Sequence, residues 1–241
     1  MAELPSDDEV VSLDAAGLID VWERAAGASQ LLRAPILLAA AWPGYDWLRA
    51  PIGQRDRYLF RLRTALFGDA LDAVASCPSC AADLELPLRA GDLLTPPGTG
   101  DGPRELRHGD SLVRYRLPTT LDLLSVADAA PDRRRDLLLR RCLLEGAADE
   151  PAIDAAIVAG MVEADPQADT SLALACPECG HAWSAPFDIA AYLWADLEAC
   201  ARRLLRQVHT LAAAYGWSER DILGLSAARR RLYVDVVMGA A

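Results

Sequence analysis

The sequence predicts a mainly helical α+β protein whose small β element is a zinc ribbon split between two distant segments. Three observations support this fold class. Two C-x-x-C knuckles, in "AVASCPSCAADLELPL" and "SLALACPECGHAWSAPF", each lie between short apolar runs that suit strands. Apolar residues recur at helical spacing through most of the remaining chain. The Pro/Gly-rich stretch "LTPPGTGDGP" belongs to a large mixed insertion between the knuckles.

The first 70 residues predict an N-terminal helical region. Residues 1–11 are acidic and are expected to attach loosely. A Pro-Gly pair in "WPGYDW" separates the second and third helices. Pro51 suits the first turn of the third helix, and Gly68 suits its end. The predicted helices are 14–26, 29–41 and 51–67.

The split ribbon is assigned to residues 71–89 and 170–187, with strands on both sides of each knuckle. Between them, residues 90–169 form the predicted insertion. It begins with a loop and a hairpin, "RELRHGDSLVRYRL", whose turn is expected at 108–110. Three helices are predicted to follow, at 120–128, 131–144 and 151–163.

Residues 188–241 predict a C-terminal helical region. A long helix from 188 to about 214 carries one apolar stripe with steps of three or four residues. Ser218 and Asp221 match a capping box for the next helix, and Ser226 begins the last one. The stripe consists of Leu193, Leu197, Cys200, Leu204, Val208 and Leu211.

The four knuckle cysteines predict one structural Zn²⁺ site. Tetrahedral zinc in structural sites prefers four soft ligands, and each C-x-x-C turn supplies two thiolates. Residues 81–175 separate the two pairs, far more than in ordinary ribbons. Closing so long a loop costs entropy, which metal binding offsets as folding free energy. The predicted ligands are Cys77, Cys80, Cys176 and Cys179.

Other interpretations of the cysteines remain open at this point. The knuckles could be redox motifs or unrelated buried thiols, although two matched copies favour a metal. His181 lies close to Cys179, but four thiolates already fill a tetrahedral shell and leave no open position for catalysis. Cys142 and Cys200 lie on apolar helix faces, so we expect both to be buried.

Composition and motifs argue against an enzyme and against broad nucleic-acid binding. The 241 residues are 52% hydrophobic with a net charge of −11, whereas nucleic-acid binders usually present a basic field. No phosphate-binding loop, dinucleotide fingerprint, zinc-protease or nucleophile-elbow motif occurs. His209 is expected to be structural. We therefore expect no catalytic residues and no bound organic cofactor.

The 24 basic residues are all arginine, and many of them cluster. Arginine suits ion pairs and protein interfaces, and solvated faces paired with acidic residues are the plainer explanation. The aromatic residues Trp42, Tyr45 and Trp47 suit either an interface or the core. The clusters are Arg55, Arg57, Arg61 and Arg63; Arg133, Arg134, Arg135, Arg140 and Arg141; and Arg229, Arg230 and Arg231.

The longest apolar run, residues 34–42, is too short to span a bilayer, and the acidic start lacks the basic region of a signal peptide. We therefore expect a cytoplasmic protein without a membrane span.

Several stretches resemble a family encoded among contractile injection systems and phage-tail-like particles. They are "RDRYLFRLRTALFGDALDAVASCPSC", "DPQADTSLALACPECGHAWSAPFDIAAYLW" and "VHTLAAAYGWSERDILGLSAARRRLYVDVV". The family is similar to baseplate hub assembly chaperones of T-even-type phages, and the resemblance covers about residues 50–238. It implies a protein that assembles a baseplate or hub through protein contacts, and the four knuckle cysteines match the family pattern.

Two functional hypotheses follow. The first is a non-enzymatic assembly factor, a chaperone or adaptor, whose partners are baseplate or hub proteins of a contractile tail-like particle. The second is a zinc-ribbon regulatory protein that binds nucleic acid, which only the ribbon and the arginine clusters favour.

Overall fold

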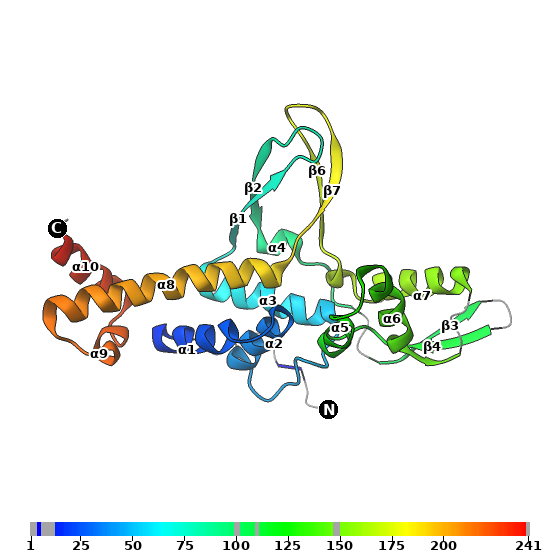
Figure 1. Ribbon diagram of the computed structural model, residues 1–241, viewed down its shortest axis with the longest axis horizontal. Coiled ribbons are helices and arrows are strands. Elements are labelled where there is room, and N and C mark those ends of the chain that lie inside the picture. The colour runs from blue at the N-terminus through cyan, green and yellow to red at the C-terminus, as the bar shows by residue number, and fades with distance from the viewer. Residues whose placement is uncertain (1–3, 6–12, 99–101, 109–110, 147–149, 240–241) are drawn as a thin grey trace.

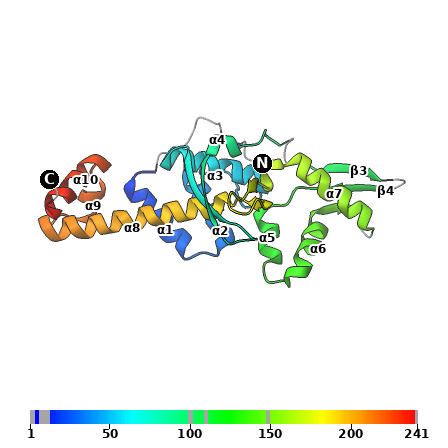
Figure 2. The ribbon, with the colours of Figure 1, turned by 90° about the horizontal axis from the view of Figure 1, so that it is seen from above.

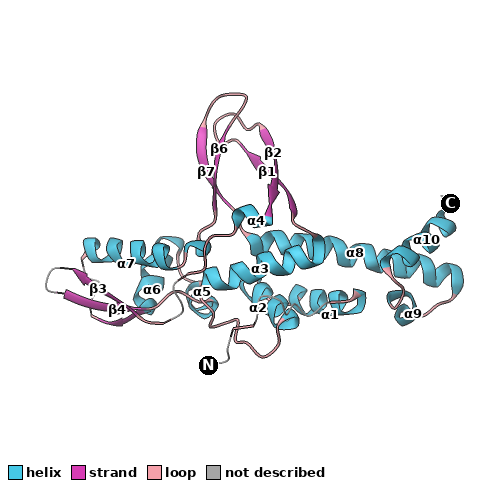
Figure 3. Ribbon diagram, turned by 180° about the vertical axis from the view of Figure 1, so that it is seen from behind, coloured by secondary structure: helices cyan, strands magenta, loops and turns pink. Residues whose placement is uncertain are grey.

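The computed structural model describes residues 4–5, 13–98, 102–108, 111–146 and 150–239. Within these ranges the chain is largely helical with short antiparallel strands, which confirms the α+β class (Figure 3). The helices are α1 (Ala15–Ala26), α2 (Gln30–Ala41), α3 (Ile52–Phe67), α4 (Ala90–Leu93), α5 (Thr120–Val126), α6 (Pro131–Cys142), α7 (Pro151–Ala164), α8 (Ile189–Tyr215), α9 (Glu219–Leu223) and α10 (Ala227–Met238), with a 3-10 turn, η1 (Pro166–Ala168). The strands are β1 (Ala70–Ser76), β2 (Asp83–Arg89), β3 (Arg104–His108), β4 (Ser111–Tyr115), β5 (Leu143–Glu145), β6 (Ser171–Ala175) and β7 (Ala182–Pro186).

Three parts extend from a central helical body made of α1, α2, α3 and the first half of α8 (Figure 1). The ribbon, which consists of β1, β2, β6 and β7, stands on one side of this body. The part of the insertion that contains α6, α7, β3 and β4 lies at one end of the long axis, whereas α4 lies at the base of the ribbon. The C-terminal arm, residues 203–239, lies at the other end, where α8 extends past the body to α9 and α10 (Figure 2).

The central helical body forms because its four helices share one apolar core, and two of them, α1 and α8, begin at a side-chain cap. The side chain of Asp14 accepts the N–H of Gly17 at 2.8 Å and starts α1, and Asp188 accepts the N–H of Ala191 at 3.0 Å and starts α8. The largest core side chains include Trp42, Trp47, Tyr58, Phe60, Leu193 and Leu197.

Within the described ranges, no helix has the length and apolar character needed to cross a bilayer.

The arginine cluster on α3 is not the solvated face that its sequence suggests. Arg55 and Arg63 are buried, at 7% and 6% exposure. Arg63 donates to Asp196 of α8 at 3.1 Å, and Arg55 donates to Asp56 at 2.7 Å and to the buried Thr120 at 3.2 Å. These two arginines therefore tie α3 to α8 and to the insertion, because buried guanidinium groups require polar partners.

The ribbon consists of two separate hairpins. The register of β1 and β2 ends with Ser76 opposite Asp83, and that of β6 and β7 ends with Ala175 opposite Ala182. Each knuckle is the turn that follows these last pairs. The root of the ribbon belongs to the body, because Leu71 is fully buried in the core of the helices.

The insertion contains the predicted hairpin, but a third strand makes it a sheet of order β3-β4-β5. We predicted one helix over 131–144, whereas α6 ends at Cys142 and the chain turns extended to pair Leu143 with Tyr115. The predicted turn at 108–110 falls partly outside the described residues. A small separate core holds the sheet against α6 and α7: Val113, Tyr115, Leu139, Ile153 and Ile157.

A buried carboxylate organises the side of the insertion nearest the body. Asp122 is 1% exposed and receives two hydrogen bonds from Arg116, at 2.6 and 2.8 Å, and one from Arg141 at 3.3 Å. It also closes the capping box of α5 with Thr119. Burial by itself raises the pKa of Asp122, but the bonds from Arg116 and Thr119 outweigh it and lower the pKa to about 2.

The C-terminal arm follows the predicted signals. Gly216 ends α8 in the left-handed conformation, Ser218 and Asp221 form the capping box of α9, and Ser226 caps α10. Most of the predicted α8 stripe is buried, with Val208 half-buried. His209 was predicted to be structural and near this stripe, but it lies on the exposed side of α8.

Candidate metal centre

The two knuckles have the same backbone geometry. In the first, the N–H of Cys77 donates to the carbonyl of Ala82 at 2.8 Å, and the N–H of Ala81 donates back to the carbonyl of Cys77 at 2.9 Å. In the second, Cys176 donates to His181 at 2.9 Å and Gly180 donates to Cys176 at 2.9 Å. The two turns are therefore equivalent, position by position.

The equivalence extends to an unusual backbone angle. Ala81 and Gly180 occupy the same position and have φ values of 60° and 72°. Among the described residues, Ala81 is the one non-glycine residue with positive φ. L-residues adopt this left-handed conformation at a cost, whereas glycine adopts it freely.

The paired turns bring all four predicted cysteines together. Their sulfur atoms lie within 4.8 Å of one another, and no other such metal-ligating cluster occurs in the part of the chain that the structure describes. The Sγ atoms of Cys77 and Cys179 are 3.7 Å apart, and those of Cys80 and Cys176 are 3.6 Å apart. All four cysteines are free thiols, since a disulfide would require about 2.05 Å.

These distances fit a tetrahedral metal. Ligands at the zinc–sulfur distance of about 2.3 Å place adjacent sulfurs of a regular tetrahedron about 3.8 Å apart. The separations of 3.7 and 3.6 Å match that value, and each comes from a different pair of residues across the two hairpins. The cluster is thus a four-cysteine metal site to which each hairpin contributes two ligands.

The thiols strongly influence one another's charge. Burial raises the pKa of Cys77, but the backbone N–H groups of Cys80 and Ser79 outweigh it and lower the pKa to about 7. The Ala82 N–H lowers the pKa of Cys80, but the sulfurs of Cys176 and Cys179 outweigh it and raise the pKa to about 12. Four neighbouring thiols therefore do not all ionise unless a cation balances them, which is what a divalent metal supplies.

The remaining histidine and cysteine candidates lie outside this cluster. His181 contributes its backbone carbonyl to the second knuckle, and its exposed ring stacks on Trp183 with ring centroids 6.0 Å apart. Cys142 and Cys200 are buried, at 1% and 7% exposure, as predicted. Under the sulfurs, Leu84 and Trp183 provide apolar packing.

Comparison of the chain with protein-family models, curated proteins and solved structures finds no match.

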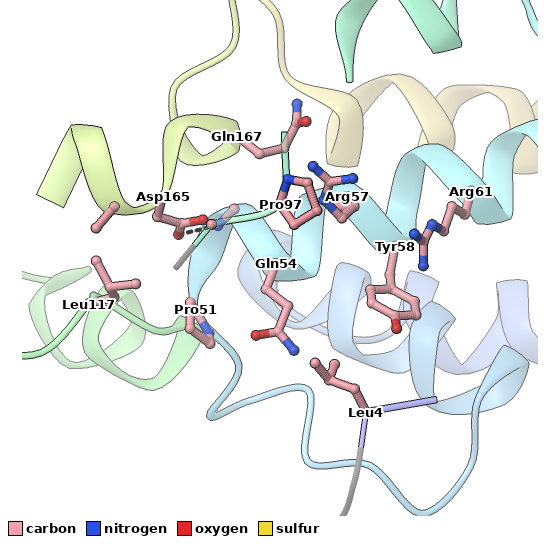
Figure 4. A pocket seen from close by; sticks show the side chains of 13 residues that line it. Leu4, Pro51, Gln54, Arg57, Tyr58, Arg61, Pro97, Leu117, Asp165 and Gln167 are labelled. Atoms are coloured by element: carbon pink, nitrogen blue, oxygen red, sulfur yellow. Dashed lines mark hydrogen bonds between the residues drawn. The ribbon is translucent and has the colours of Figure 1, made fainter. Parts of the chain in front are cut away.

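A small pocket of about 190 Å³ lies where the insertion meets α3 (Figure 4). Its charged groups have structural partners. Arg57 donates to the carbonyl of Thr95, and Arg61 lies 4.8 Å over the ring of Tyr58. Burial raises the pKa of Asp165, although the N–H of Gly53 opposes this shift. None of the described residues that line the pocket is a serine, cysteine or histidine.

Two features, one in the knuckles and one beside the pocket, could not be predicted from the sequence. The left-handed backbone of Ala81 follows from its alignment with Gly180, which only the shared knuckle geometry makes visible. Asp165 attaches the end of the insertion to Gly53 of α3, and Gln167 joins this end to the start of the insertion; no sequence motif marks either residue. Gln167 accepts the N–H of Thr95 at 2.9 Å and donates to the carbonyl of Leu93 at 3.1 Å.

Proposed function

We propose that this chain is a non-enzymatic assembly factor, acting as a chaperone or adaptor, for the baseplate or hub of a contractile phage-tail-like injection system. Its metal is a structural Zn²⁺ held by the four knuckle cysteines. The observation that carries the proposal is a closed four-cysteine site that joins the two hairpins flanking the insertion, in a molecule from which three parts project. The resemblance of residues 50–238 supports the setting.

The ligand set favours a structural metal. Zinc that performs chemistry keeps an open position for water or substrate, whereas four thiolates complete the tetrahedron. Two ligands precede the insertion and two follow it, so the metal joins segments on both sides of residues 90–169. The bound ion therefore stabilises the relative placement of the ribbon, the insertion and the body.

The shape of the molecule favours a role in protein contacts. The ribbon, the insertion and the C-terminal arm extend in different directions from the body, so each can meet a different neighbour (Figure 1). Exposed apolar side chains concentrate on the last helix, and soluble proteins use such groups at interfaces. They are Leu232, Val236, Val237 and Met238, with exposures of 64%, 57%, 36% and 71%.

The surface of the ribbon disfavours the nucleic-acid alternative. Zinc ribbons that bind nucleic acid need basic groups to neutralise phosphates. Four carboxylates are instead exposed on the two hairpins, and the whole chain has a net charge of −11. The carboxylates belong to Asp72, Asp83, Glu85 and Glu178.

Genetic and biochemical experiments together test the proposal. We expect the zinc-loaded protein to bind a purified baseplate or hub protein of the same particle, and we expect a deletion strain to make incomplete particles. A Cys176→Ser variant should neither bind this protein nor restore complete particles to the deletion strain. A Cys142→Ala variant, altered at a cysteine outside the cluster, should do both. Normal, complete particles from the deletion strain would show that the assembly role is wrong. A salt-dependent gel shift of DNA or RNA would support the alternative instead.

A further inference from the structure

A basic groove of about 530 Å³ lies among α8, α10 and the start of α1. Arg203 and Gln207 of α8 form one wall, and Arg230 and Arg231 of α10 form another. No sequence motif marks this groove, because its arginines come from two helices and one of them lies outside the "ARRRLY" run.

Arg230 is a buried cation with neutral partners. It is 5% exposed, its Nε donates to Gln207 at 2.8 Å, and its Nη1 donates to the carbonyl of Leu225 at 2.9 Å. Burial lowers the pKa of Arg230, Cys200 raises it, and the positive charge of Arg203 lowers it again. Holding a buried charge without an opposite charge is costly, and an anion in the groove would relieve that cost.

The neighbouring arginines add to this unbalanced charge. Arg203 contacts the sulfur of Cys200 at 3.5 Å, and Arg231 lies exposed at the rim of the groove. Within the described ranges, Arg203, Arg230 and Arg231 form no ion pair with a carboxylate. Among the described residues that line the groove, the one acidic residue is Asp14, which is already engaged as the cap of α1. Three guanidinium groups thus converge in a strongly acidic chain.

Apolar side chains farther along the C-terminal arm, outside the lining of the groove, indicate a protein as the source of the anion. Met238 is 71% exposed and lies two turns beyond Arg231, on the same flank of α10. A cluster of aromatic rings lies where α8 meets α10, with Tyr215 stacked on Trp217 at 4.7 Å and Tyr233 edge-on to Trp217 at 5.0 Å. Arginine, methionine and aromatic side chains are enriched in protein interfaces, and an inorganic ion would not use the apolar ones.

We propose that this groove binds a carboxylate side chain from an acidic, apolar segment of a partner protein. Paired guanidinium groups hold a carboxylate with charge-assisted hydrogen bonds, and the apolar residues of α10 cover the hydrophobic part of the segment. The proposal deepens the assembly function above and depends on it only in taking the partner to be a protein.

Labelled helical peptides of 15 residues, with leucine on one face, test the groove directly. One peptide carries glutamate beside the leucines, and its match carries glutamine. We expect the zinc-loaded protein to bind the glutamate peptide at least about tenfold more tightly. Arg203→Gln with Arg231→Gln should abolish this preference. Arg206→Gln with Arg229→Gln should keep it, because that pair removes the same charge from the same two helices outside the groove.

Each remaining outcome counts against the proposal. Equal binding of the two peptides, or an equal loss in both double variants, would show that no specific carboxylate site exists. Inorganic phosphate or duplex DNA that binds as tightly, and depends on Arg203 and Arg231, would make the groove a phosphate site. All four substituted arginines are exposed, so thermal melting of both double variants should match that of the unaltered protein.

The two proposals can fail separately. If a baseplate protein binds equally well to the Arg203→Gln, Arg231→Gln variant, the groove proposal is wrong and the assembly function stands. If the peptides behave as expected but no baseplate or hub protein binds, the assembly function is wrong and the groove stands.

Discussion

The backbone N–H of Gly53 donates to the carboxylate of Asp165 at 2.8 Å, although 112 positions separate the two residues. The bond joins the first turn of α3 to the point where the insertion returns to the body. A Cβ atom on residue 53 would collide with the other carboxylate oxygen and lie 2.6 Å from the backbone nitrogen of Ala168. The contact therefore depends on a glycine at this position, because of close approach and not because of backbone angle.

Gly53→Ala is expected to lower the free energy of unfolding by about 2 kcal/mol, because overpacked sites force neighbouring backbone to move. Chemical denaturation measures this loss. Gly27→Ala is the matched control, since it has open space and an ordinary helical backbone and should be neutral or slightly stabilising. Equal stability of the two variants would mean that the α3–η1 contact is not tight.

Asp122 gives the stability of the protein a defined dependence on pH. Its folded-state pKa of about 2 is below the ordinary value of 3.8, so its contribution is complete above about pH 4 and disappears as the pH falls toward 2. The difference between these pKa values corresponds to about 2 kcal/mol. Asp122→Asn should therefore lose at least that amount at pH 7 and very little near pH 2.

Denaturation of the two proteins at several pH values measures this difference. The comparison isolates the contribution of Asp122, because other pH effects are the same in both proteins. These effects are zinc release and the titration of Asp56 and Asp165, two carboxyls whose pKa values are raised by burial. A difference that stays constant between pH 7 and pH 2 would contradict the assigned pKa.

We expect about one zinc ion per chain. A strong chelator should remove this ion and lower the thermal stability of the protein. An ion present at about 1,000 times its dissociation constant stabilises a protein by about 4 kcal/mol, or roughly 10 °C for a chain of this size. Elemental analysis and thermal melting measure both effects. Cys176→Ser should bind less metal, whereas Cys142→Ala should bind the normal amount. A purified protein without metal would overturn the site.

The equivalent turn residues predict a pair of opposite effects. Ala81→Gly should raise stability by about 1 kcal/mol, because glycine removes the cost of a left-handed backbone. Gly180→Ala should lower stability by a similar amount. Denaturation of the zinc-loaded variants gives both values, and changes of the same sign would show that the two knuckles are not equivalent.

Local signals predicted much of this fold. Helical periodicity, Pro-Gly breaks and caps determine structure over a few residues, so α2 and α8 lie close to their predicted bounds and α9 begins after its predicted cap, Ser218. The four knuckle cysteines were also predictable, because a thiolate pair at C-x-x-C spacing needs a second pair to complete a tetrahedron.

Features that depend on distant partners were not predictable in this way. Residues 143–144, which follow α6, resemble helix in sequence, but Leu143 pairs with Tyr115 on a strand far upstream. In the sequence Arg63 resembles a surface arginine, but in the fold it forms an ion pair with Asp196 of α8. The basic groove was not predictable for the same reason: it forms only because α10 packs against α8 and places Arg230 near Arg203.

The shared metal also has a topological consequence. Because two sulfurs precede the insertion and two follow it, a single backbone cut anywhere within residues 81–175 would leave two fragments that each hold half of the ligand shell. Such a nicked protein should migrate as one particle under native conditions and as two pieces after chelation and denaturation. The chain could thus be expressed as two separate polypeptides that find each other through one ion.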